Sequence, residues 1–164
     1  MTLKKRVLVA VPLLSLLAFA GANSATFART VSAATSNNIE GTWLTQITAV
    51  SCQTGVPLGN FSSIYSFADG GTLTNITNGA SPAVRSPGLG AWAKTGDHAF
   101  KAVSMALLFN SAGVWTGTQK IANTLEILHD RNELTGIISV EISNTSGTPV
   151  STMCATLVGQ RLEP

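Results

Sequence analysis

The stretch that decides the fold is residues 114–127, VWTGTQKIANTLEI. Its odd positions are Trp115, Gly117, Gln119, Ile121, Asn123, Leu125 and Ile127, and they include most of its large apolar side chains. Its even positions are mostly polar. Alternation with a period of two is typical of a β-strand that buries one face. We therefore predict a strand whose odd face points into a core.

Similar segments fill the rest of the chain after Gly41. Strands are predicted at 41–52, 60–68, 71–77, 88–95, 97–109, 113–128, 133–143 and 149–160. Short turns rich in Gly, Pro, Asn, Asp and Ser separate them, which indicates hairpins between successive strands. The predicted fold class is all-β, an eight-stranded antiparallel up-and-down β-barrel that leaves no exposed sheet edge. An open two-sheet sandwich is the alternative.

The N-terminal segment has the layout of a secretory signal peptide. A basic cluster at 4–6 precedes an apolar run at 7–20, and small residues follow. The run is shorter than the roughly 20 apolar residues of a membrane-spanning helix, so we expect cleavage between residues 20 and 34 and no stable membrane anchor. Residues 1–34 are then signal peptide and flexible segment, and 35–164 form the barrel domain. The expected location is secreted or periplasmic.

Charge and cysteine content limit the partners and the chemistry. Four of the ten basic residues and none of the eight acidic ones precede residue 34, so cleavage near there leaves a net charge of −2. No basic patch remains, and nucleic acid is not an expected partner. Cys52 and Cys154 fall on the first and last predicted strands, which a closed barrel makes neighbours. In an exported protein they predict one disulfide, with two free thiols as the alternative.

A Gly-x-Trp motif begins at Gly41, Gly90 and Gly113. With Trp43 on the first strand and Arg161 just after the last, the chain resembles the calycin superfamily, which includes lipocalins and avidins. Thr156-Leu157-Val158-Gly159 is also similar to the end of avidins. The resemblance implies that Arg161 packs on Trp43 and closes one end of the barrel, so both are structural. It does not extend to biotin, because Thr45 stands where avidins carry asparagine.

A candidate ligand pocket follows from polar and aromatic residues expected inside the barrel. The predicted ligand-binding residues are Tyr65, Trp92, Trp115, Gln119 and Asn123. Buried amides need hydrogen-bond partners, which a ligand or the core itself supplies. We also expect Gly117 to leave space. For the three tryptophans, simple packing is the alternative to ligand contact.

Other reactive groups show no catalytic pattern. His98 and His129 lie beside predicted turns and are expected at the surface, and Glu126 and Glu141 are expected to point outward. No metal site and no cofactor are predicted.

Three functions remain open from the sequence. The leading hypothesis is a secreted barrel that binds a small apolar molecule. One alternative is a cyclase or isomerase, by analogy with the small barrels of allene oxide cyclases. The other is a structural or interaction protein with a filled core. Because the segment 97–109 is apolar on both faces, its outer face is expected to be covered by the N-terminal segment or by another subunit, which leaves a homo-oligomer open.

Overall fold

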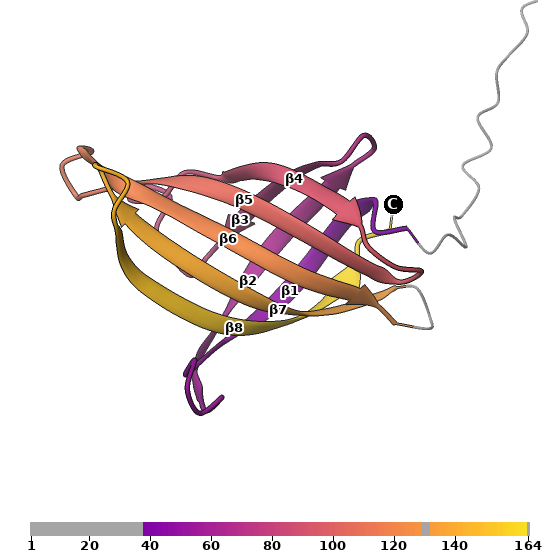
Figure 1. The fold of residues 1–164 in the computed structure, drawn as a ribbon. Helices are drawn as coiled ribbons and strands as arrows, with labels where there is room; N and C mark the ends of the chain where they lie inside the picture. The colour runs from indigo at the N-terminus through magenta and orange to yellow at the C-terminus, as the bar shows by residue number, and fades with distance from the viewer. Residues whose placement is uncertain (1–37, 129–131, 164) are drawn as a thin grey trace, which may run out of the picture. The chain divides into compact units, whose positions relative to one another are not determined.

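The computed structural model describes residues 38–128 and 132–163, which form an antiparallel β-barrel (Figure 1). Each strand pairs with the next in chain order, and the last pairs with the first. The strands are β1 (Gly41–Val50), β2 (Pro57–Ala68), β3 (Thr72–Thr77), β4 (Gly88–Lys94), β5 (Ala99–Phe109), β6 (Trp115–Ile127), β7 (Glu133–Asn144) and β8 (Pro149–Arg161). The predicted eight-stranded barrel is confirmed and the two-sheet sandwich is wrong. The predicted signal peptide and His129 lie outside the described residues.

Strand boundaries follow the predicted turns closely. The largest difference is at β2, which begins at Pro57 where the sequence predicts a turn. Proline is tolerated at the first residue of a strand because it needs to donate no ladder hydrogen bond there. The other strand ends lie within two residues of their predicted positions.

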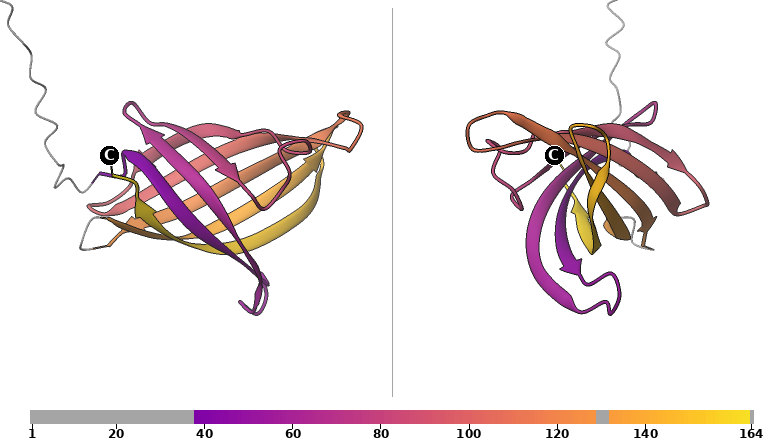
Figure 2. Two further views of the ribbon diagram at one scale, coloured as in Figure 1. Left: turned by 180° about the vertical axis from the view of Figure 1, so that it is seen from behind. Right: turned by 60° about the vertical axis from the view of Figure 1, so that its left-hand side comes forward.

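The two ends of the barrel differ in their connections, as Figures 1 and 2 show. We call the end where β1 begins and β8 ends the base, and the opposite end the mouth. The β2–β3 and β4–β5 turns lie at the base. The β1–β2, β3–β4, β5–β6 and β7–β8 connections lie at the mouth, and the longest of them, residues 78–87, joins β3 to β4.

The base is filled by aromatic and aliphatic side chains. Its buried residues include Ile39, Trp43, Phe67, Leu73, Phe100, Ile127 and Leu134. The Trp92 ring packs edge-on against Phe67 and Phe100, with centroids 6.2 and 6.0 Å away. This half of the barrel is a packed hydrophobic core.

Trp43 and Arg161 close the base together. The Trp43 side chain is fully buried, and its indole Nε1 donates to the Ile39 carbonyl at 2.8 Å. The Arg161 guanidinium lies over the ring, 4.3 Å from its centroid, and donates to the carbonyls of Asn38, at 2.8 Å, and of Glu40. The predicted contact between the two residues is confirmed.

The Gly-x-Trp motif has a physical basis at its first occurrence. Gly41 has φ of +119°, and a Cβ there would meet Arg161 Nη1 at 2.9 Å. A side chain would therefore strain the backbone and displace the arginine.

The predicted Cys52–Cys154 disulfide is confirmed, although Cys52 lies in the turn just after β1 and not on the strand itself. The Cys52–Cys154 bond has a Cα–Cα distance of 5.2 Å, and Val50 pairs with Cys154 across the β1–β8 ladder. Because the two residues are 102 positions apart, the cross-link restricts the unfolded chain strongly and should stabilise the fold by about 2–4 kcal/mol.

The start of β6 departs from the predicted alternation. The β5–β6 register shifts so that Leu108 pairs with Gly117 and Phe109 with Trp115. Gly117 has φ of +151°, and a Cβ there would meet the Ser143 carbonyl oxygen at 2.0 Å. The expectation that Gly117 leaves space in the interior is wrong, because the neighbouring strand occupies that position.

The outer face of β5 is as apolar as predicted. Val103, Met105 and Leu107 are 44%, 49% and 46% exposed. Within the described residues no other segment covers them. Among those residues, too, no helix is long and apolar enough to cross a membrane.

Candidate functional site

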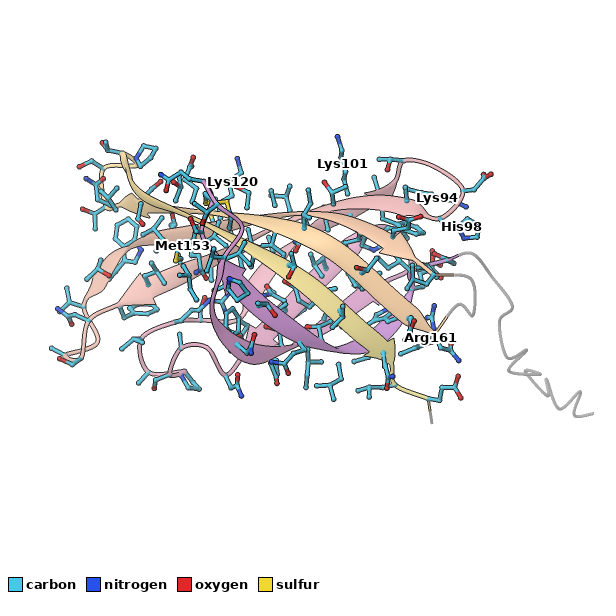
Figure 3. The ribbon with its side chains drawn as sticks, turned by 90° about the horizontal axis from the view of Figure 1, so that it is seen from below. Lys94, His98, Lys101, Lys120, Met153 and Arg161 are labelled. Atoms are coloured by element: carbon cyan, nitrogen blue, oxygen red, sulfur yellow. A yellow bond between two sulfur atoms is a disulfide. The ribbon has the colours of Figure 1, made fainter. Side chains whose placement is uncertain are left out.

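The interior between the packed base and the mouth contains a cavity of about 190 Å³. Strands β1, β2, β3, β6, β7 and β8 and the 78–87 connection contribute to its wall. Its lining residues are Ile47, Ala49, Phe61, Ser63, Tyr65, Asn75, Thr77, Gly79, Ala80, Arg85, Gln119, Ile121, Ile138, Val140, Met153, Cys154 and Ala155. In Figure 3, Met153 lies away from the base, which Arg161 marks, while Lys101 and Lys120 point outward from the barrel.

The floor of the cavity is a polar contact across the barrel. The Tyr65 hydroxyl on β2 donates to Asn123 Oδ1 on β6 at 3.4 Å, and Asn123 Nδ2 donates to the Ala102 carbonyl at 3.5 Å. Both side chains are almost fully buried. Burial raises the pKa of the Tyr65 phenol to about 12, although the positive charge of Arg85 acts in the opposite direction. The phenol is therefore protonated at neutral pH.

A second buried polar pair lies on the β3–β5 side. The Ser104 hydroxyl donates to Asn75 Oδ1 at 3.1 Å. Gly88 on β4 makes room for this amide, since a Cβ there would meet Asn75 Oδ1 at 1.9 Å. Asn75 thus reaches the cavity wall with its carbonyl oxygen already bonded.

Arg85 is the only charged side chain among the described residues that line the cavity. It is 6% exposed. Its Nε donates to Gln119 Oε1 at 2.6 Å, and its Nη1 donates to the Ser86 carbonyl at 3.1 Å. Its Nη2 is buried and has no hydrogen-bond partner in the part of the chain that the structure describes. Burial lowers the pKa of the guanidinium, an effect that Tyr65 partly offsets.

The 78–87 connection holds Arg85 in place through bonds to both sides of the mouth. At its start, Asn78 N donates to the Ser62 carbonyl at 3.1 Å, and Asn78 Oδ1 accepts from Ser62 N at 2.8 Å. At its end, Ser86 N donates to the Leu107 carbonyl at 3.0 Å. The connection is thereby tied to β2 and to β5, and Arg85 enters the barrel from between these anchors.

The predicted ligand residues fall into two groups. Tyr65 and Gln119 line the cavity, and Asn123 lies directly below it as the partner of Tyr65. Trp92 is half-buried in the base, where its Nε1 donates to the Ala68 carbonyl at 3.0 Å. Trp115 is 44% exposed, and its Nε1 donates to the Gly117 carbonyl at 2.7 Å.

Neither Trp92 nor Trp115 is among the residues that line the cavity. The expectation that Trp115 faces the interior is wrong, because the register shift at the start of β6 interrupts the alternation there.

Sequence reasoning missed Arg85. It lies between two turn-forming pairs, Ser81-Pro82 and Ser86-Pro87, in the segment between the predicted strands 71–77 and 88–95. One signal was present in the sequence: no acidic residue occurs between Asp69 and Asp97, so this arginine has no local partner. Local sequence could not show, however, that the connection folds inward.

Comparison of the chain with protein-family models and with curated protein sequences finds no match. Within the described residues, no three of the His, Cys, Asp and Glu side chains come together as metal ligands would.

Proposed function

We propose that this protein is an exported, calycin-like binding barrel that holds one small, largely apolar molecule between the packed base and the mouth. The observation that carries the proposal is the cavity itself. Its walls are mostly apolar, and a few polar groups lie at defined places on them. That combination is typical of small-molecule sites. The Cys52–Cys154 disulfide is consistent with a protein that folds outside the cytosol.

The cavity volume restricts the size of the ligand. At about 190 Å³, the cavity is smaller than the roughly 300–1,000 Å³ of pockets for drug-sized ligands, whereas a cavity of about 150 Å³ accommodates benzene. A ligand with a single ring or a short chain fits this space.

The polar groups of the cavity favour binding over catalysis. A general acid or base works best when its pKa lies near the operating pH. The pKa of the Tyr65 phenol is shifted away from neutrality, to about 12. The cyclase or isomerase hypothesis therefore has less support than the binding hypothesis. A wholly filled core has less support still, since the interior above Tyr65 is open.

The test uses a neutral probe of the right size, benzyl alcohol, with binding measured by calorimetry and by NMR shifts of the cavity methyl groups. Ile138→Trp should fill the cavity and abolish binding. Ile137→Trp is the matched control, because Ile137 is adjacent on β7 but 64% exposed on the outer face. The proposal fails if the wild type binds no small probe, or if both variants bind equally well.

A further inference from the structure

Arg85 has a feature that the binding of an apolar molecule does not explain. Its side chain lines the cavity and is 6% exposed, yet Nη2 has no hydrogen-bond partner among the described residues. Burial of a charged or polar group without a partner is costly, and such groups are nearly always paired in folded proteins. The exception needs a cause, and an anionic ligand would supply the missing partner.

The surroundings of Arg85 leave its charge uncompensated. None of the described residues that line the cavity is acidic. The two groups that do bond to the guanidinium, Gln119 Oε1 and the Ser86 carbonyl, are neutral acceptors. They orient the side chain without cancelling its charge, so the cavity wall carries a fixed positive charge.

We propose that the ligand carries a carboxylate head group, which binds the Arg85 guanidinium, on an apolar body that packs against the aliphatic wall. This inference rests on the proposed function and names the class of ligand for the same cavity. Guanidinium and carboxylate groups match in geometry and form strong charge-assisted hydrogen bonds. The body would contact Ile47, Ile121 and Ile138, which line the same cavity. Small aromatic or short-chain carboxylic acids are the class that fits both features.

Three probes of nearly equal shape test the charge requirement: benzoate, benzyl alcohol and benzylamine. Wild-type protein should bind benzoate on the order of 10- to 100-fold more tightly than benzyl alcohol, and benzylamine most weakly. If benzyl alcohol binds and benzoate does not bind more tightly, the carboxylate inference is overturned while the proposed function stands. If none of the three binds, the proposed function itself fails.

Gln119→Glu is the sharpest variant, because it is nearly isosteric and places a carboxylate where Arg85 Nε already donates. It should remove the preference for benzoate over benzyl alcohol, which is measured as the ratio of the two affinities. Arg85→Met should do the same without adding a charge. Circular dichroism would establish that both variants fold. Retention of the wild-type benzoate preference in either folded variant would show that Arg85 does not recognise the ligand.

Discussion

The base and the mouth of this barrel each contain an arginine that is at least half-buried. The two arginines differ in how completely their guanidinium groups are hydrogen-bonded. At the base, Arg161 lies over the Trp43 ring and donates to two backbone carbonyls. Near the mouth, Arg85 is more deeply buried and retains a nitrogen without a partner among the described residues. Burial lowers the pKa of both guanidinium groups.

The difference separates, within one barrel, a part that stabilises the fold from the part that we propose binds a ligand. The base is packed, and the Trp43 indole and the Arg161 guanidinium there donate to backbone carbonyls, so it stabilises the fold. The cavity half contains an open space and an uncompensated charge, which weaken packing there. The proposed ligand would fill the space and pair with the charge. Proteins commonly keep such locally unfavourable groups where function needs them.

The largest expected effect tests the packed base. Trp43→Ala should lower the free energy of unfolding by about 3–5 kcal/mol, because it removes a fully buried indole from the core. Trp115→Ala is the matched control and should change it by no more than about 0.5 kcal/mol, since Trp115 is 44% exposed. Urea denaturation measures both. Equal losses in the two variants would contradict the division between base and mouth.

An intermediate effect tests Tyr65, at the boundary between the two halves. In the unfolded chain the phenol titrates near pH 10, whereas in the folded protein its pKa is about 12. Above pH 10 the unfolded state ionises first, so stability present below pH 10 should be lost between about pH 10 and 12. The loss should be roughly 2–3 kcal/mol.

Urea denaturation at several pH values would measure this loss, and absorbance near 295 nm would report ionisation without ambiguity because Tyr65 is the only tyrosine. Tyr65→Phe removes the titrating group and is the control. If the wild type and Tyr65→Phe lose stability in parallel over this range, the phenol is not buried as described.

The smallest expected change in stability comes from replacing each of the two arginines in turn. Arg161→Met should cost about 1–2 kcal/mol, because it removes two charge-assisted hydrogen bonds and the contact with the Trp43 ring. Arg85→Met should be near neutral or slightly stabilising, because an apolar side chain removes a buried charge that lacks a full set of partners. Thermal denaturation of the two variants side by side measures the difference. A larger loss for Arg85→Met would assign Arg85 to the structure of the 78–87 connection instead.

Much of the fold was predictable from local patterns. The alternation along β6 from Gln119 to Ile127 predicted which side chains face inward, because successive residues of a strand point to opposite faces. Closure of the barrel then made the first and last strands neighbours. That adjacency predicted the Cys52–Cys154 bond. The contact between Trp43 and Arg161 was instead what the resemblance to calycins implied.

The errors lie where the backbone departs from regular geometry. The prediction that Trp115 faces inward is wrong because a register shift at the start of β6 interrupts the period of two. Such a shift depends on the pairing of β5 with β6. The interpretation of Gly117 failed for a related reason, since the space beside it is taken by Ser143 of the neighbouring strand.

The sequence by itself determined the strands, their order and the closed base, because these depend on periodicity, turn-forming residues and a few strongly paired side chains. Several residues of the candidate site were predicted from the sequence, but only the tertiary structure decided how they are assembled and that Arg85 joins them. Tyr65 and Asn123 are 58 residues apart, and Arg85 and Gln119 are 34 apart. These pairs meet only when the barrel closes and the 78–87 connection is tied between β2 and β5. A charged side chain in a turn is normally exposed to water. Arg85 is buried because the distant strands β2 and β5 hold the 78–87 connection against the mouth of the barrel.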